Sequence, residues 1–422
     1  MLDILFIKNN LSEAITSLKK KKFESDFILK KLIELDEERI ESQKKSNNIQ
    51  EKINTNAKKI GELYKQKNID DATELKSYGT KLKEELKIIL ENEKNIKNEL
   101  YSLLITIPNI PNSKVPEGDS EEHNKVEKTK NIKFTNTSNY LAHWELAKKY
   151  DLIDFEKGTT ITGSGFPLYK NKGAIIQRAL INFFLEFNTN AGYCEYIPPL
   201  LVNPESALGT GNLPDKDGQM YHIEKDNLYL IPTAEVPLTN IYRDEIIESS
   251  TLPIKITAYT PCFRREAGSY GKNVRGLNRL HQFDKVEIVQ ITHPNNSYNQ
   301  LKEMIEHVER LLNELELPFR LVKLCGGDLS FSSALTYDFE VFSVAQNKWL
   351  EVSSVSNFET FQARRSNIRC KKNNEINFCH TLNGSSLALP RVLAAILENN
   401  QNENGIKIPK SLIKYTGFET IS

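Results

Sequence analysis

Two runs of seven-residue hydrophobic repeats constrain the fold of this chain more than any other feature. Along the first run, positions seven residues apart are Ile28, Leu35, Ser42, Ile49, Asn56 and Leu63. Along the second they are Leu75, Leu82, Ile89, Ile96 and Leu103. Such heptads are typical of helices that pack along one another. Because the repeat breaks at YKQKNIDD, residues 64–71, the sequence predicts an antiparallel helical hairpin with arms of roughly 37 residues, about 55 Å long.

A proline-rich segment ends the second run. Pro108, Pro111 and Pro116 cannot continue a helix, and the residues before them prefer extended geometry. We therefore expect a helical domain over residues 1–110 and a second domain over residues 111–422. Within the second domain the pattern predicts helices at 138–157 and 173–193, followed by a β-rich run with two prolines at 194–202.

Length and composition exclude several classes of protein. The 422 residues suffice for two or more domains, and 56 basic residues balance 56 acidic ones, so any nucleic-acid contact must come from a local patch. There is no apolar run long enough to span a membrane and no signal-peptide core at the start, so we expect a cytoplasmic protein without a membrane partner. The five cysteines form no C-x-x-C pair, which argues against a disulfide framework or a zinc site.

The stretch FRREAGSYGKNVRGLNRLHQFDKVE, residues 263–287, predicts two antiparallel strands joined by a long polar loop. Arg264 and Glu266 share one face at strand spacing, and Arg275 and Arg279 return on the other arm. Arginine forks suit phosphate oxygens. The loop also has glycines that could fold over a polyphosphate, namely Gly268, Gly271 and Gly276. The alternative is a solvated ladder of ion pairs on a sheet surface.

This stretch resembles motif 2 of the class II aminoacyl-tRNA synthetases, and its extended form is similar to that of the seryl-tRNA synthetase family. Other phrases of the family follow in order: GTGNLP at 209–214, LIPTAEVPLTN at 230–240, EVSSVSNFETFQARR at 351–365 and HTLNGSSLALPR at 380–391. The helix, strand and prolines of 173–199 resemble motif 1, the dimer-interface element. The resemblance implies an α+β fold: an antiparallel β-sheet catalytic domain of the class II type, an N-terminal antiparallel coiled-coil hairpin, and a homodimer.

The reaction that the resemblance implies is activation of L-serine by ATP, followed by transfer to the 3′ end of tRNA(Ser) and possibly tRNA(Sec). Attack of a carboxylate on the α-phosphate needs cations and in-line positioning more than a covalent nucleophile. The resemblance gives the two catalytic roles to Arg264, at the α-phosphate and the serine carboxylate, and Arg391, at the γ-phosphate. Glu266 would bind the adenine amino group, and Phe283 and the backbone of Leu280 would enclose the base. The remaining ATP-binding candidates are Arg265, Arg275, Arg279, Glu351, Val352, Ser353 and Ser354.

Two further sets follow from the same resemblance. Mg²⁺ accompanying ATP would be held by Glu351 and Ser354, because a carboxylate and a hydroxyl beside phosphates suffice for this ion. The serine-binding candidates are Thr233, Ala234, Glu235, Glu287, Asn383 and Ser385. No zinc is expected, since no cluster of Cys and His residues is visible. The predicted hairpin carries many lysines, which would bind the tRNA in this family and are otherwise only its solvated faces.

The chain departs from the family pattern at a few positions. Arg265 replaces a small residue, Pro390 precedes Arg391 where glycine is common, and Ser330 and Leu335 replace an expected glycine and lysine. Two rival functions remain at this point. One is a class II synthetase for another amino acid, and the other is a non-catalytic relative that binds tRNA or a carrier protein.

Overall fold

The computed structural model describes residues 1–130, 140–215, 217–266 and 275–422. They form two compact units, one of residues 2–19 and 23–108, the other of residues 109–422 together with Met1 and residues 20–22. Within the described ranges, the structure has no helix that is both long enough and apolar enough to span a bilayer.

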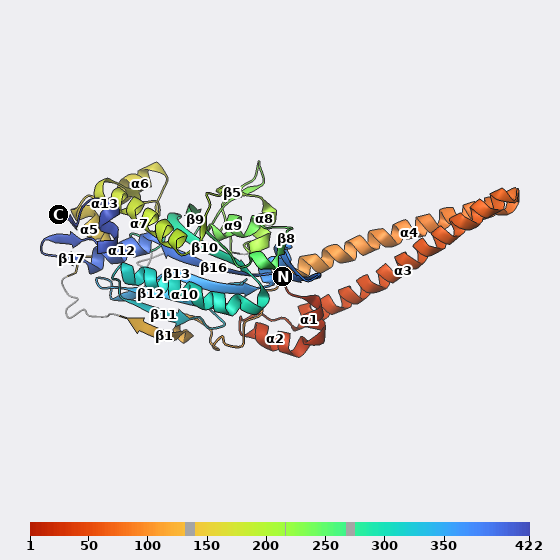
Figure 1. Ribbon diagram of the computed structural model, residues 1–422, viewed down its shortest axis with the longest axis horizontal. Coiled ribbons are helices and arrows are strands. Elements are labelled where there is room, and N and C mark those ends of the chain that lie inside the picture. The colour runs from red at the N-terminus through yellow and green to blue at the C-terminus, as the bar shows by residue number, and fades with distance from the viewer. Residues whose placement is uncertain (131–139, 216, 267–274) are drawn as a thin grey trace. The chain divides into compact units, whose positions relative to one another are not determined.

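The first unit is helical and contains the predicted hairpin. Its elements are α1 (Ile4–Asn9), α2 (Leu11–Lys19), α3 (Asp26–Lys65) and α4 (Ile69–Leu104). The helices α3 and α4 lie side by side along their length (Figure 1). Leu35 and Ile49 of α3 and Leu82 and Ile96 of α4 are buried in the seam, as the heptads predict. The hairpin prediction is confirmed.

The polar positions of the heptad seam have partners. Asn56 is buried, and its Nδ2 donates to the carbonyl of Leu75 on the opposite helix at 2.8 Å. At the turn, the side chain of Asn68 accepts from the backbone N–H of Asp71 and caps α4. Asn56 and Asn68 therefore each form a hydrogen bond to the backbone, one across the seam and one at the start of α4.

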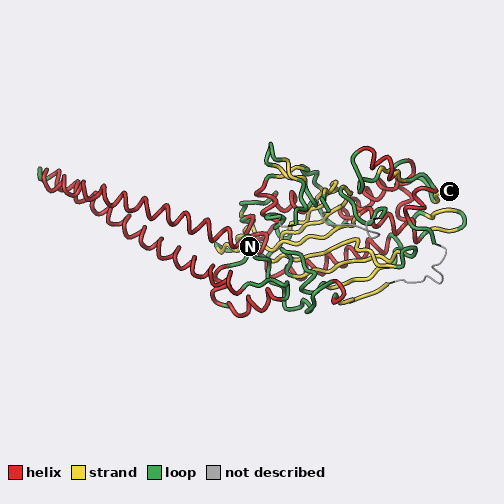
Figure 2. Tube along the Cα trace, turned by 180° about the vertical axis from the view of Figure 1, so that it is seen from behind, coloured by secondary structure: helices red, strands yellow, loops and turns green. Residues whose placement is uncertain are grey.

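The second unit is built on an eight-stranded sheet of order β1-β11-β12-β13-β16-β10-β9-β4 (Figure 2). All neighbouring strands are antiparallel except β4 and β9. The strands are β1 (Lys125–Lys130), β4 (Cys194–Glu195), β9 (Ile254–Phe263), β10 (Gln282–Thr292), β11 (Phe319–Lys323), β12 (Leu335–Ser343), β13 (Lys348–Glu359) and β16 (His380–Ala388).

Three helices cover one face of this sheet: α7 (Asn171–Asn190), α10 (Ser297–Glu314) and α12 (Leu389–Asn399). Phe184, Met304 and Leu393 from these helices are fully or almost fully buried in one core with the strands. On β10, Val286 and Ile288 join that core, and the alternate residues point to the other face, where the candidate site lies. The α+β fold of antiparallel sheet and flanking helices is confirmed.

The remaining elements surround this centre. The helices are α5 (His143–Lys149), α6 (Phe155–Ile161), α8 (Pro204–Thr210), α9 (Glu235–Asn240), α11 (Phe361–Ser366) and α13 (Lys410–Thr416). The short strands are β2 (Ile153–Asp154), β3 (Leu168–Tyr169), β5 (Leu201–Val202), β6 (His222–Ile223), β7 (Leu228–Leu230), β8 (Ile246–Glu248), β14 (Arg369–Lys372), β15 (Glu375–Phe378), β17 (Gln401–Asn402), β18 (Gly405–Lys407) and β19 (Thr420–Ile421).

The single helix expected at 138–157 is wrong. The chain forms α5, turns through Asp151 at φ 53°, pairs β2 with β3, and only then begins α6. Asp154 caps α6 by accepting from the backbone N–H of Lys157 at 2.8 Å. Aspartate is unfavourable inside a helix and favoured at the N-cap, because its side chain accepts from free backbone N–H groups there. Asp154 therefore starts a second helix, although the apolar spacing runs on without a break.

Candidate active site

The predicted hairpin of residues 263–287 is formed by β9 and β10, which pair antiparallel from Ile254 opposite Ile291 to Phe263 opposite Gln282. The expectation that Arg264 and Glu266 occupy strand positions is wrong, because β9 ends at Phe263 and Glu266 has φ 49°. Both side chains nevertheless line the same cavity beyond the strand end. The glycines at 268 and 271 lie outside the described residues, and Gly276 lies within them.

We call this cavity the inner cavity. It lies over β10 and is lined by Arg264, Glu266, Leu277, Asn278, Arg279, Leu280, Phe283, Lys285, Glu351, Val352, Ser385, Ala388, Pro390 and Arg391. The guanidinium of Arg264 lies 5.2 Å from the centre of the Phe283 ring, and its Nε donates to the carbonyl of Pro232 at 3.3 Å. Glu266 forms an ion pair with Arg279. The cavity thus has an aromatic wall between arginine cations.

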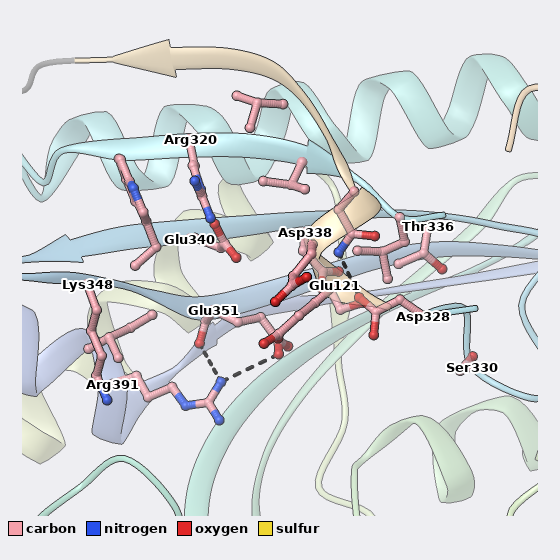
Figure 3. Close-up of a pocket in the computed structure, with 18 of the residues that line it drawn as sticks. Glu121, Arg320, Asp328, Ser330, Thr336, Asp338, Glu340, Lys348, Glu351 and Arg391 are labelled. Atoms are coloured by element: carbon pink, nitrogen blue, oxygen red, sulfur yellow. Dashed lines mark hydrogen bonds and ion pairs between the residues drawn. The ribbon is translucent and has the colours of Figure 1, made fainter. Parts of the chain in front are cut away.

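A β-bulge on β13 opens a second space beside it. Phe339 pairs with Ser353 and Glu340 pairs with Glu351, so Val352 is the extra residue. Residues three apart on a regular strand point to opposite faces, but the bulge brings Glu351 and Ser354 to the same side. They line an outer cleft of about 1270 Å³, which Asp338, Glu340 and Arg320 also line. Figure 3 shows this group around Glu351.

Arg391 joins the inner cavity to the outer cleft, because it lines both. Its Nε donates to the carbonyl of Asn278 at 3.1 Å, and its Nη1 donates to the carbonyl of Glu351 at 2.8 Å (Figure 3). Arg391 lies in the first turn of α12, where Pro390 is tolerated because it lacks only an N–H that has no helical partner there. The departure at Pro390 therefore leaves the helix start intact.

A buried carboxylate lies beside the inner cavity and is bonded to Lys285, which lines that cavity. Glu287 is fully buried, and its Oε2 lies 2.6 Å from Lys285 Nζ and accepts from Thr233 Oγ1 at 3.3 Å. Its Oε1 accepts from Asn383 Nδ2 at 3.2 Å. Ser385 pairs with Glu287 across β16 and β10 and lines the cavity. These residues come from separate phrases of the sequence: Lys285 and Glu287 lie on β10, Asn383 and Ser385 lie on the adjacent β16, and Thr233 lies between β7 and α9.

A second carboxylate, Glu235, lies at the start of α9 and accepts from Gln362 Nε2 at 2.6 Å. Burial, together with the nearby charge of Glu287, raises the pKa of Glu235 to about 7. Burial also raises the pKa of Glu287, although Lys285 opposes this shift. The charge of Glu287 contributes to this shift of Glu235, and Lys285 and Arg264 are the cations that act on both carboxylates. An ammonium ligand here would oppose the repulsion between the two carboxylates.

The other predicted site residues have different surroundings. Arg265 is exposed and Arg275 lies over the Trp144 ring at 4.7 Å; neither lines the inner cavity. Ser353 is buried on the opposite side of its strand from the cleft and donates to the carbonyl of Ser385 at 2.6 Å. Ala234 is buried among Leu238, Ile256 and neighbouring apolar side chains. The binding roles of these residues remain predictions.

Comparisons with known proteins agree with this geometry. The family model of the seryl-tRNA synthetase N-terminal domain matches residues 1–111, and that of the tRNA synthetase class II core domain (G, H, P, S and T) matches residues 220–400. The serine–tRNA ligase of Salinibacter ruber is 46% identical over 100% of this chain and 99% of its own. The chain belongs to the seryl-tRNA synthetase family.

Solved structures extend the likeness to the whole fold. The crystal structure of seryl-tRNA synthetase from Pyrococcus horikoshii complexed with ATP has a TM-score of 0.92 at 32% identity, covering 100% of this chain and 99% of that one. The cytoplasmic serine–tRNA ligase from Naegleria fowleri in complex with AMP has a TM-score of 0.88 at 28% identity, with the same coverage. The seryl-tRNA synthetase fold is therefore present along the entire chain.

Sequence reasoning missed two residues of this seryl-tRNA synthetase site. Lys285 is 6% exposed and is the ion-pair partner of Glu287, and Asn278 offers its carbonyl to Arg391. The alternation of β10 could have identified Lys285, because residues 283, 285 and 287 share one face. Of the two departures near 330, Leu335 is buried in the core and Ser330 lines the outer cleft.

Proposed function

We propose that this chain is a serine–tRNA ligase, which joins L-serine to ATP to form seryl-adenylate and pyrophosphate and then transfers the seryl group to the 3′ end of tRNA(Ser). The observation that carries the proposal is the inner cavity, which is lined by arginines and by Lys285 and Ser385, the ion-pair and strand partners of the buried carboxylate Glu287. The names of the relatives, which are serine–tRNA ligases over their full length, support the same reaction.

The buried end suits the amino acid. The ammonium group of serine would pair with Glu287 and Glu235, the two buried carboxylates near Lys285. Thr233, Asn383 and Ser385 are the polar neighbours available to the serine hydroxyl. A site that hydrogen-bonds a hydroxyl rejects the analogue that lacks it by a factor of about 10⁴ or more, because buried polar atoms would be left unpaired. We expect alanine to be excluded on this ground.

The arginine end suits ATP. Phe283 offers a ring for the adenine, with Arg264 beside it. Arg264 would neutralise the α-phosphate while the serine carboxylate attacks it in line, and pyrophosphate would leave toward Arg391. A bond forms between the carboxylate oxygen and the α-phosphorus. The bond between the α-phosphorus and the oxygen that bridges to the β-phosphate breaks, and that oxygen leaves with pyrophosphate. The polypeptide supplies charge and orientation and forms no covalent bond.

The donor set at the outer cleft fits Mg²⁺. Glu351 and Ser354 offer a carboxylate and a hydroxyl on the same side, and Asp338 Oδ1 is buried without a hydrogen-bond partner. Across residues 1–130, 140–215, 217–266 and 275–422, no three His, Cys, Asp or Glu side chains cluster to hold a metal ion by themselves. This agrees with an ion held partly by phosphates. When bound, Mg²⁺ would supply positive charge to the ATP phosphates.

The hairpin and the dimer complete the proposal. Exposed lysines on α3 and α4, such as Lys44, Lys58 and Lys83, would provide phosphate contacts for tRNA(Ser), with tRNA(Sec) as a second candidate substrate. Ile197, within the element that resembles motif 1, is 92% exposed, which supports a homodimer interface there. We place the enzyme in the cytoplasm, with the tRNA-binding domain over residues 1–110.

Exchange of labelled pyrophosphate into ATP tests this function. Purified protein is assayed with serine, threonine, alanine, glycine or proline, and the expected result is exchange with serine alone. Exchange with another amino acid would overturn the serine pocket. No exchange with any amino acid, despite ATP binding, would favour a non-catalytic relative.

The Arg264→Ala variant sharpens the assay. The change removes the guanidinium beside Phe283, and we expect exchange to fall by a factor of about 10² to 10³, because this cation stabilises the reacting phosphate. The circular dichroism spectrum and thermal midpoint should stay near those of the parent. The matched control is Arg310→Ala, which removes an exposed arginine on α10. This variant should retain full exchange. Unchanged exchange in Arg264→Ala would refute the role of Arg264.

A further inference from the structure

A buried polar cluster lies behind the inner cavity and takes no part in lining it. It consists of His143 from α5, Ser343 at the end of β12, Gln346 from the β12–β13 connection, and Glu398 from α12. His143 and Glu398 are both fully buried. A carboxylate and an imidazole are costly to bury, so their contacts indicate what the arrangement holds in place.

The Glu398 carboxylate is the centre of this cluster. Its Oε1 accepts from His143 Nδ1 at 2.7 Å, from the His143 backbone N–H at 3.0 Å and from Gln346 Nε2 at 3.0 Å. Its Oε2 accepts from Ser343 Oγ. All of these hydrogen bonds donate to the carboxylate, and such donors favour its charged form against the effect of burial. Glu398 therefore acts as an ionised acceptor.

The other ring nitrogen of His143 reaches the segment that follows the loop of motif 2. His143 Nε2 accepts from the backbone N–H of Leu277 at 2.8 Å. An imidazolium has no acceptor nitrogen, so the ring is neutral, with its proton on Nδ1 and directed to Glu398. Glu398 thereby fixes the tautomer that Leu277 requires.

The chain approaches His143 closely, and the approach depends on glycine. Gly276 has φ 69°, and a Cβ there would lie 2.2 Å from His143 Nε2. Next to it, the Arg275 guanidinium lies 4.7 Å from the centre of the Trp144 ring. Residues 275–277 are thus held against two consecutive residues at the start of α5.

The cluster also reaches the nucleotide end of the cavity. Gln346 donates its amide to Glu398, which leaves its Oε1 to accept from Asn278 Nδ2 at 2.9 Å. The carbonyl of Asn278 in turn accepts from Arg391 Nε at 3.1 Å. One buried carboxylate therefore fixes both Leu277 and Asn278, and through Asn278 it orients Arg391.

We propose that His143 and Glu398 are positioning residues for ATP: they hold the Leu277–Asn278 backbone and thereby set the orientation of Arg391. The proposal rests on the proposed function, because it takes Arg391 as a phosphate ligand. The pair does not touch the serine end, where Glu287 is bonded to Lys285, Thr233 and Asn383. Its loss should therefore weaken the use of ATP and spare serine.

The test compares Michaelis constants in serine-dependent pyrophosphate exchange. His143→Phe keeps a ring but removes both hydrogen bonds, and it should raise the KM for ATP about tenfold while the KM for serine changes by less than about twofold. The matched control is His307→Phe. His307 is also buried and bonded, to Asn188 Oδ1 at 2.7 Å, but it lies on α10 away from both cavities. It should change thermal stability without changing either KM.

A second variant keeps the proposal testable if His143→Phe fails to fold. Gln346→Ala removes a half-buried side chain and its hydrogen bonds to Asn278 and Glu398, but it keeps the bonds from His143 to Glu398 and Leu277. It should therefore fold and raise the KM for ATP about threefold. An unchanged KM for ATP in Gln346→Ala, or an equal rise for serine and ATP in His143→Phe, would overturn the positioning role. If the parent protein itself shows no exchange with serine, the proposed function fails instead.

Discussion

Two charged regions at the inner cavity differ in burial: the serine end, where Lys285 is paired with Glu287, and the ATP end, around Arg391 and Glu351. At the serine end, Glu287 is fully buried and Lys285 is 6% exposed, and the pair is bonded before any ligand arrives. At the ATP end, the side chains of Arg391 and Glu351 are 32% and 49% exposed and lie 3.5 Å apart. Coulomb interactions are several times stronger at the buried end, because less water screens them.

This difference separates specificity from positioning. A buried, pre-bonded carboxylate discriminates among small amino acids, because a wrong ligand leaves polar groups unpaired. Exposed arginines in an open cleft can follow a polyphosphate that carries its own charge and its own Mg²⁺. Mutations at the two ends should therefore differ in which substrate they affect and in how far they destabilise the fold.

The largest effect is expected from Glu287→Gln. It removes the charge that serves the serine ammonium and leaves Lys285 buried without its ion pair. We expect kcat/KM for serine to fall by about 10³ or more, and the free energy of unfolding to fall by about 3 to 5 kcal/mol.

The matched control for this change is Glu351→Gln at the exposed end. It also removes one carboxylate charge, but it should cost less than about 1 kcal/mol of stability. Urea unfolding followed by circular dichroism measures both values. Equal losses of stability in the two variants would remove the distinction between a buried and an exposed end.

An intermediate effect is expected from Arg391→Ala. The change removes the guanidinium that bridges Asn278 and Glu351, so kcat/KM for ATP should fall about 10²-fold while the KM for serine stays within about twofold. Arg320→Ala, in the same cleft but ion-paired with Glu340 and lying over Trp349, removes the same charge and should change ATP use little. If both variants weaken ATP use equally, net charge rather than the position of Arg391 governs the cleft.

The predictable parts of the molecule are those in which neighbouring residues carry the signal. The heptads predicted the hairpin because buried positions recur every seven residues, and even the polar Asn56 falls on the seam. The short phrases placed Glu287, Asn383 and Ser385 together, since each phrase resembles one strand of the family's site. Their positions on β10 and β16 agree with that expectation, although their roles remain predictions.

The parts that escaped prediction depend on contacts between distant residues or on local irregularity. His143 and Glu398 are separated by 255 positions in the sequence. Each is one polar residue of a helix, and nothing beside it in the sequence indicates its partner. The bulge at Val352, which turns Glu351 and Ser354 to one side, leaves no mark in an alternating strand pattern. The helix break near Asp151 was missed because apolar spacing continues through it, whereas the cap at Asp154 decides where α6 begins.

The smallest of the expected effects is a pH dependence confined to the serine end. The pKa of Glu235 is raised to about 7, and an ammonium ligand needs the ionised carboxylate. As pH falls below 7 the carboxyl becomes protonated, so the KM for serine should rise by up to about tenfold per pH unit, while the KM for ATP stays nearly constant. Glu287, Lys285 and Arg264 also act on this carboxyl, and Lys285 and Arg264 oppose its protonation.

Pyrophosphate exchange between pH 6 and pH 8 measures this dependence, with Glu235→Gln as the control. The variant cannot ionise at this position, so its KM for serine should be high throughout and should change little over the same range. A parent whose serine KM is flat would show that Glu235 stays ionised in the empty pocket, with Lys285 and Arg264 stronger than burial. A variant that keeps the full pH dependence would assign the titration to Glu287. Either result identifies the carboxylate whose negative charge binds the serine ammonium at the buried end. The exposed end needs no such group, because its arginines keep their charge over this pH range.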